Sequence, residues 1–92
     1  MSVEVRIPTM LRSHVAGAAT VAVEGATIRE VVDHLVGSYP SLAGQIVTPD
    51  GALHKFVNVY LNDDDIRYLD KLDTKVGDGD TVSILPAVAG GA

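Results

Sequence analysis

The segment that begins at Thr27 carries the clearest helical pattern in the chain. A helix at this position limits the folds that the whole chain can adopt. Thr27 and Glu30 have the spacing of a capping box, in which Thr27 accepts from the Glu30 N–H and Glu30 reaches back. We expect Gly37 to end the helix and Pro40 to prevent its resumption. The apolar residues recur at i, i+3, i+4 and i+7, on one helical face: Ile28, Val31, Val32 and Leu35.

Segments on both sides of this helix alternate between apolar and polar residues, as half-buried strands do. Val3, Val5 and Ile7 form the first predicted strand, which Pro8 ends. Thr20 to Glu24 form the second, and residues 8–19 between them read as a loop, which favours a hairpin. Further strands are expected after the helix at residues 54–61, 66–69 and 81–85, with turns at 62–65 and 77–80 and a short helical turn over 42–46.

This order, two strands, one helix and then three strands, predicts a two-layer α+β domain. The last strand can return beside the first and run parallel to it, which is the arrangement of the β-grasp (ubiquitin-like) fold. We therefore expect a mixed four- to five-stranded sheet packed on one main helix. Residues 1–86 would form this domain, and residues 87–92 a flexible C-terminal tail.

Composition excludes several classes of function. The chain has 12 acidic and 7 basic residues and a net charge of −5, so binding to nucleic acid phosphates is not expected. It contains no cysteine, which excludes disulfides and thiolate chemistry. No apolar run approaches the roughly 20 residues of a membrane span, and the N-terminus lacks the layout of a signal peptide, so we expect a cytoplasmic protein.

The internal residues indicate no active site. His14, His34 and His54 fall on different predicted elements without metal-ligand spacing. The acidic run at residues 63–65 lacks the glycine and terminal glutamate of a calcium-binding loop and reads as a solvated turn. We expect no catalytic residue, no metal site and no cofactor in this chain.

The C-terminal segment is different, because it is small, apolar and uncharged in an otherwise acidic protein. Residues 78–91, which include Leu85-Pro86-Ala87-Val88-Ala89-Gly90-Gly91, resemble the closing signature of the sulfur-carrier and ubiquitin-like modifier families. These families include the molybdopterin synthase small subunit and the thiamine-pathway sulfur carrier. Residues 54–91 most resemble the actinobacterial sulfur carriers of cysteine biosynthesis, and residues 5–12 are similar too.

The resemblance implies a carrier and not an enzyme. A partner enzyme would adenylate the C-terminal glycine carboxylate, and sulfide or a persulfide would then displace AMP to leave a thiocarboxylate on Gly91. The thiocarboxylate would supply sulfur to a pyridoxal-phosphate-dependent cysteine synthase, and a metallopeptidase would release the cysteine. The tail that enters the partners' active sites would comprise Pro86, Ala87, Val88, Ala89 and Gly90.

The tail composition fits this role. Glycine has no Cβ to collide with the walls of a narrow cleft. Extended, the residues from Ala87 to Gly91 reach about 17 Å at ~3.3–3.6 Å each. Ordering them costs roughly 1–2 kcal/mol per residue, so the folded body must contribute to docking. Strand alternation predicts that Phe56, Tyr60 and Leu85 lie on the open face of the sheet, where they could contact a partner.

The chain departs from the family pattern at Ala92, which follows the second glycine. We expect a peptidase to remove Ala92 and expose Gly91; a cloning remnant and direct activation of Ala92 are the alternatives. Other functions also remain open: sulfur donation to molybdopterin, conjugation of Gly91 to target lysines, or a structural module with an inert tail. A monomer suits a carrier that visits several enzymes.

Overall fold

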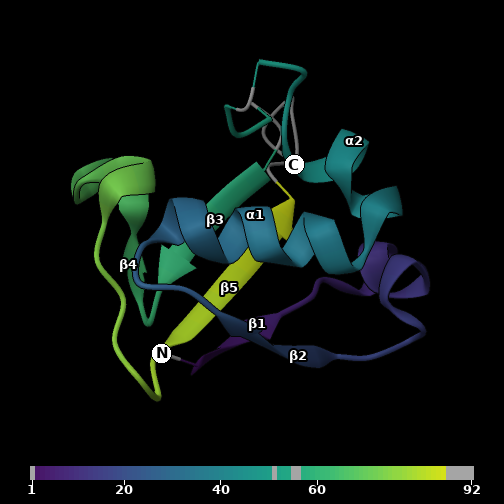
Figure 1. Cartoon of the computed structure of the whole chain (residues 1–92), viewed down its shortest axis with the longest axis horizontal. Helices are drawn as coiled ribbons and strands as arrows, with labels where there is room; N and C mark the ends of the chain where they lie inside the picture. The colour runs from purple at the N-terminus through teal and green to yellow at the C-terminus, as the bar shows by residue number, and fades with distance from the viewer. Residues whose placement is uncertain (1, 51, 55–56, 87–92) are drawn as a thin grey trace.

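The computed structural model describes residues 2–50, 52–54 and 57–86. Within this part of the chain, a five-stranded sheet with the strand order β2-β1-β5-β3-β4 carries one main helix across one face (Figure 1). The elements, where η denotes a 3₁₀-helix, are β1 (Ser2–Arg6), η1 (Thr9–Val15), β2 (Thr20–Glu24), α1 (Ile28–Ser38), η2 (Pro40–Leu42), α2 (Ala43–Ile46), β3 (Val57–Leu61), β4 (Asp64–Asp65), η3 (Ile66–Tyr68), η4 (Lys71–Asp73) and β5 (Thr81–Pro86).

The topology confirms the predicted β-grasp fold. β1 and β2 form an antiparallel hairpin in which Val5 lies opposite Val21. After α1, the chain returns to place β5 parallel to β1, with Val82 opposite Val5. β3 then pairs antiparallel with the other side of β5. The last strand therefore occupies the centre of the sheet, with hydrogen-bonded neighbours on both sides.

The core is aliphatic. The apolar face of α1 packs on the inner face of the sheet, and Leu35 and Val5 are each fully buried. No Phe or Tyr belongs to the fully buried core among the described residues. Buried residues from the helix and the three central strands are Ile28, Val31, Val32, Leu35, Val3, Val5, Val59, Val82 and Ile84.

The N-terminus of α1 has the predicted cap, with one difference. Thr27 Oγ1 accepts from the Glu30 N–H at 3.3 Å, as a capping box requires. Glu30 Oε1 accepts from the backbone N–H of Ala26 at 2.8 Å, so Glu30 reaches one residue further back than we predicted. Both bonds satisfy N–H groups at the start of the helix.

The prediction that Gly37 ends the helix is wrong. The helix runs through Gly37 to Ser38, and the Tyr39 N–H donates to the Leu35 carbonyl at 2.9 Å to close the last turn. Gly37 has no positive φ, the conformation that makes glycine a helix terminator. Pro40 opens η2, so it prevents continuation of the α-helix as expected.

Two other segments differ from the sequence prediction. Residues 66–69 were predicted as a strand, but η3 occupies this stretch and the short β4 lies just before it. The Asp65 carboxylate accepts from the Arg67 N–H at 2.9 Å, which turns the chain into η3. The predicted loop at 8–19 contains η1, which buries Leu11 and Val15 against the core.

Candidate functional site

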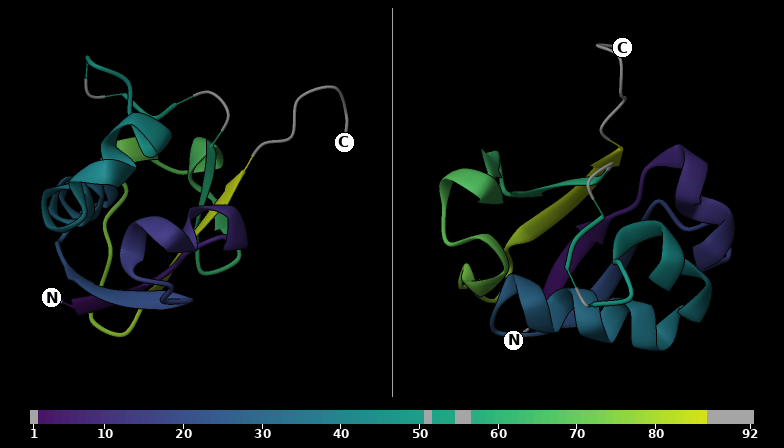
Figure 2. Two further views of the ribbon diagram at one scale, coloured as in Figure 1. Left: turned by 90° about the vertical axis from the view of Figure 1, so that its right-hand side faces the viewer. Right: turned by 90° about the horizontal axis from the view of Figure 1, so that it is seen from above.

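The central strand β5 leads directly to the candidate tail. Pro86, its last residue, lies opposite Val57 of β3. β1 pairs with the first half of β5, and β3 pairs along its whole length to Pro86, at the yellow end of the ribbon in Figure 2. The predicted acyl site at Gly91, the removable Ala92 and the tail residues Ala87, Val88, Ala89 and Gly90 lie outside the described residues. The division into residues 1–86 and 87–92 stays a prediction.

Tyr60 and Leu85 lie on the face of the sheet opposite α1. Their neighbours Val59 and Ile84 are buried beneath the helix, and alternation along a strand turns the next side chain outward. Leu85 is 45% exposed, which is high for leucine, and Tyr60 is half-buried. Phe56, the third residue of the predicted docking surface, lies outside the described residues.

The register shows how these two residues are related. Tyr60 lies opposite Ser83, and Leu85 lies opposite Asn58. Tyr60 and Leu85 are therefore diagonal neighbours across the β3–β5 pair, at a separation that large side chains can bridge. They could form part of one partner surface close to the end of β5.

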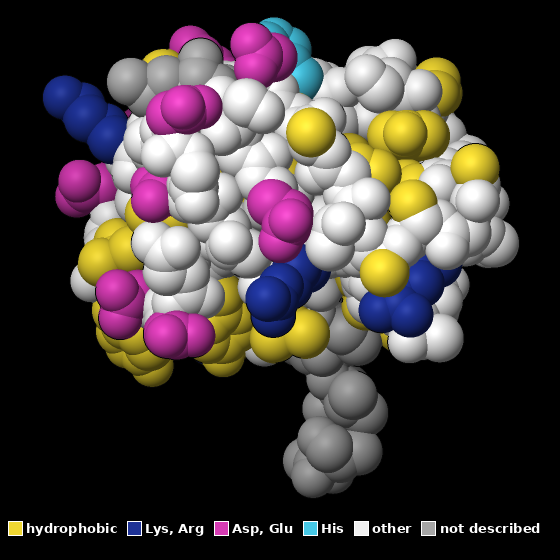
Figure 3. Space-filling view, turned by 90° about the horizontal axis from the view of Figure 1, so that it is seen from below, with side chains coloured by type: hydrophobic (Ala, Val, Ile, Leu, Met, Phe, Trp, Pro, Cys, Tyr) yellow, Lys and Arg dark blue, Asp and Glu magenta, His cyan; other side chains and the backbone are white. Residues whose placement is uncertain are grey.

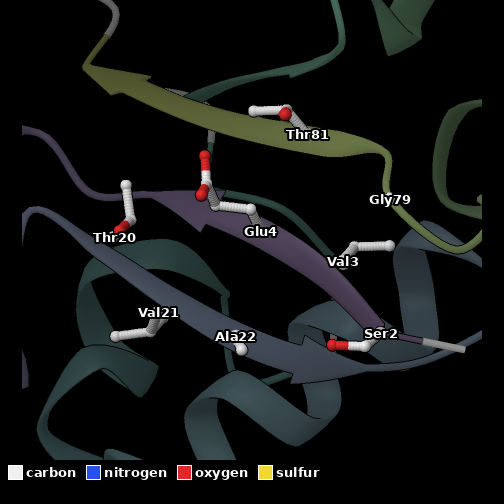
Figure 4. A pocket seen from close by; sticks show the side chains of 8 residues that line it. All are labelled: Ser2, Val3, Glu4, Thr20, Val21, Ala22, Gly79 and Thr81. Atoms are coloured by element: carbon white, nitrogen blue, oxygen red, sulfur yellow. The ribbon is translucent and has the colours of Figure 1, made fainter.

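The other half of this open face is polar. A shallow hollow of about 390 Å³ lies over β1, β2 and β5. Figure 4 shows Ser2, Glu4, Thr20 and Thr81 around it. Among the described residues that line it, Glu4 has the one ionisable side chain. This half of the face offers hydrogen-bonding groups but no catalytic arrangement.

The three histidines are dispersed, as predicted. His14 Nδ1 lies 3.0 Å from Ser41 Oγ, and His34 Nδ1 is hydrogen-bonded to the Glu24 carbonyl. His54 lies before β3 and lines a different hollow. Across residues 2–50, 52–54 and 57–86, no three His, Asp or Glu side chains come together as a metal site. None of the helices described there has the length and hydrophobicity of a membrane span.

The sequence reading missed an ordered group at the β4–η3 corner. The Asp65 carboxylate is buried and forms a side-on pair with Arg67, with Nη2 to Oδ2 at 2.8 Å and Nε to Oδ2 at 3.1 Å. The Arg67 side chain remains 63% exposed. The adjacent Tyr68 is 84% exposed, the highest value among the exposed large hydrophobic residues that the structure describes. An Asp-x-Arg spacing directly after a turn is the local signal that could have suggested this arrangement.

This pair predicts an acid-dependent loss of stability. Hydrogen bonds from the Arg67 side chain, and then from its backbone N–H, hold the pKa of Asp65 below its ordinary value of 3.8. A carboxyl whose pKa is lower in the folded state stabilises the fold above the unfolded-state pKa. That contribution disappears as the pH falls through the folded-state value. The stabilisation is therefore complete at neutral pH and is lost below about pH 4.

The variant Asp65→Asn should remove this part of the pH dependence. We expect its free energy of unfolding to fall less between about pH 5 and pH 2 than that of the parent protein, as measured by urea unfolding at each pH. Asp64→Asn is the matched control, because the Asp64 carboxylate accepts no hydrogen bond from a described residue, and it should behave as the parent does. Parallel pH profiles for Asp65→Asn and the parent would contradict the assignment.

The fold and the strand leading to the tail define a ubiquitin-like carrier class, and comparison with known proteins specifies the family. Residues 5–91 match the ThiS family model, and the chain belongs to that family. It is similar to the sulfur carrier protein CysO of Mycobacterium tuberculosis, with 45% identity over 99% of this chain and 100% of the relative. Small archaeal modifier protein 3 of Haloferax volcanii is 40% identical over 74% of this chain and 73% of its own.

Solved structures agree with these sequence relationships. The crystal structure of the Amycolatopsis orientalis BexX/CysO complex contains a chain that matches this one with a TM-score of 0.87 and 45% identity. The match covers 97% of this chain and 99% of that one. The CysO relatives are sulfur carrier proteins, and the similarity supports a sulfur-carrier function for this chain.

Proposed function

We propose that this chain carries sulfur as a thiocarboxylate on Gly91, after removal of Ala92, and delivers it for cysteine synthesis. The observation that carries the proposal is that the family match extends through Gly91, the second glycine of a tail that follows the central strand of the sheet. The 45% identity to CysO over nearly the full length of both chains supports sulfur transfer as the role.

The chemistry requires two partner-catalysed steps. The Gly91 carboxylate attacks the α-phosphate of ATP, so that pyrophosphate leaves and an acyl-adenylate forms. Sulfide then attacks the acyl carbon, AMP leaves, and the carbonyl carbon retains the new sulfur as a thiocarboxylate. No group of His, Asp or Glu side chains that could hold a metal occurs in the described part of the chain. We assign both the activation and the positioning to an adenylating enzyme.

The receiving enzyme would be a pyridoxal-phosphate-dependent cysteine synthase, on which the thiocarboxylate sulfur adds to an aminoacrylate. A metallopeptidase would then release the cysteine from the tail. Tyr60 and Leu85 on the open sheet face, together with Phe56, would supply docking energy that offsets the ordering of the tail. We place the protein in the cytoplasm, as a monomer.

The proposal is tested by intact-protein mass spectrometry. Protein ending at Gly91 is incubated with the adenylating enzyme, ATP and sulfide, and we expect the mass gain of one oxygen-to-sulfur exchange. A chain ending at Gly90 is the matched control and should gain nothing. Absence of the product on the Gly91-terminated form would reject the function. Product on the form that retains Ala92 would reject the removal step alone.

A second candidate is conjugation to protein lysines, which the 40% identity to a small archaeal modifier protein favours. Sulfur transfer to molybdopterin is a further alternative. Ladders of conjugates on a denaturing gel would support the modifier role. Release of free cysteine from the thiocarboxylate form by the synthase and peptidase would support cysteine synthesis.

A further inference from the structure

A surface hollow of about 510 Å³ lies at the β4–η3 corner, beside the proposed docking residue Tyr60. Its lining combines Tyr60, Tyr68 and Leu69 with the acidic residues Asp63 and Asp64. Figure 3 shows hydrophobic side chains beside acidic ones at the lower left, on the side of the molecule where β4 lies in Figure 1. No step of the proposed sulfur chemistry uses this hollow.

The apolar side chains of the hollow are unusually exposed. Tyr68 is 84% exposed and Leu69 is 41% exposed, although both follow the buried residue Ile66 in a short, ordered segment. Tyrosine and arginine are the residue types that most often dominate the binding energy of protein interfaces. The hollow contains both, since Arg67 also lines it.

The floor of the hollow is held in place before any partner arrives. Asp65 caps η3 through the Arg67 N–H and also binds the Arg67 guanidinium on two nitrogens. These bonds fix the backbone that carries Tyr68 and the direction of the arginine side chain. A surface that is already ordered loses less conformational entropy when it binds.

The hollow has an acidic character that specifies the charge of its partner. Arg67 is neutralised by its pair with Asp65, whereas the exposed carboxylates of Asp63 and Asp64 form no ion pair with a described residue. Two acidic charges next to an exposed tyrosine ring suit a lysine or arginine of a partner, which can contact carboxylate and ring together. A partner surface rich in acidic groups would be repelled.

The hollow borders β3, the strand that pairs with β5 along its length. Tyr60 lies opposite both Ser83 of β5 and Asp65 of β4, so the hollow continues the open face by one strand. From Ser83 to Pro86, where the described chain ends, β5 advances about 10 Å at ~3.3 Å per residue. A protein that receives the tail can therefore reach the hollow within one interface of ordinary size.

We propose that Tyr68, Leu69, Asp63 and Asp64 form, with Tyr60, a docking surface for a basic, partly apolar patch on the adenylating enzyme. This inference rests on the proposed function for the identity of the partner. It adds that electrostatic attraction at this corner orients the carrier while the tail enters the active site.

The test uses the folded carrier ending at Gly91 and the adenylating enzyme in two assays: titration calorimetry without ATP, and pyrophosphate release with ATP and increasing carrier. For Tyr68→Ser we expect at least a five-fold increase in Kd and in KM for the carrier, with kcat unchanged, since an interface residue of this kind contributes more than ~1 kcal/mol. Met10→Ser is the matched control, because Met10 is 67% exposed but lies on η1. It should change neither value.

The charge contribution has its own control. Asp63→Asn with Asp64→Asn should raise Kd and reduce its dependence on salt concentration. Glu24→Gln with Asp33→Asn makes the same change in net charge away from the hollow and should leave the salt dependence as it is. Equal effects of the two double variants would show that net charge acts without this surface, and would overturn the proposal.

The outcomes separate this inference from the proposed function. One outcome is that Tyr68→Ser binds the enzyme more weakly than the parent does, but ATP releases no pyrophosphate even with the parent carrier. This outcome would support the docking surface and reject adenylation. If every variant binds the enzyme and supports pyrophosphate release as the parent does, the proposed docking surface is wrong and adenylation is supported. Absence of both binding and pyrophosphate release with the parent would overturn both.

Discussion

Leu35→Ala is expected to lower the free energy of unfolding by about 2–5 kcal/mol. Urea unfolding followed by circular dichroism measures this change. Leu35 is fully buried on α1 and belongs to the hydrophobic core. Removing its isobutyl group loses the transfer free energy of the buried atoms and leaves a cavity that the sheet beneath cannot fill. Since small domains are stable by only about 5–15 kcal/mol, this change alone could unfold much of the protein.

Leu69→Ala is the matched control for this substitution, because it removes the same atoms from a residue that is 41% exposed. We expect its effect on the free energy of unfolding to stay within about 0.5 kcal/mol, as is usual for surface positions. Similar losses at the two positions would show that the packing of α1 on the sheet is not the main source of stability.

Gly25→Ala is expected to destabilise the fold by about 1–3 kcal/mol, although it adds only one methyl group. A Cβ at this position would lie 2.8 Å from Val31 Cγ2 and 2.9 Å from the Val31 backbone nitrogen. It would also lie 3.2 Å from the Glu30 carbonyl carbon. Two of these atoms belong to the backbone of the first turns of α1, so the collision is relieved only if the helix moves away from the end of β2.

Gly37→Ala, in α1, is expected to raise the free energy of unfolding, whereas Gly25→Ala lowers it. A Cβ there would meet no atom within 4 Å, and Gly37 lies inside α1 with no positive φ. Alanine is the better helix former by about 1 kcal/mol in a helix interior, and we expect a gain up to that size in the free energy of unfolding. Thermal unfolding of both variants decides the matter: a loss at Gly37 or no change at Gly25 would contradict these assignments.

The sequence predicted those parts of the molecule whose signals are local and periodic. The i, i+3, i+4, i+7 pattern identified the buried face of α1, since a helix with one apolar stripe must bury it. Alternation located β1, β2 and β5, and the order of these elements led to the β-grasp topology. The prediction at Gly37 was wrong because glycine ends a helix only where the chain adopts a positive φ, which composition does not reveal.

The candidate site also has a part that sequence patterns predict and a part that they do not. The proposed tail was inferred from the sequence, because the motif that ends at Gly91 is contiguous in the chain. Residues 87–92 lie outside the described residues, so the tail stays a prediction. Tyr60 and Leu85 could be assigned to the open face from alternation alone, since they sit beside buried residues on their strands.

Only the tertiary structure decided what surrounds these residues. The Asp65–Arg67 pair itself is local, and it turns the chain into η3 because a carboxylate bound to a nearby backbone N–H competes with strand pairing. That turn exposes Tyr68 and places it with Tyr60 and the acidic residues 63–64 around one hollow. Periodicity determines which face of its own element a side chain occupies, whereas its neighbours from other elements depend on how the whole chain packs.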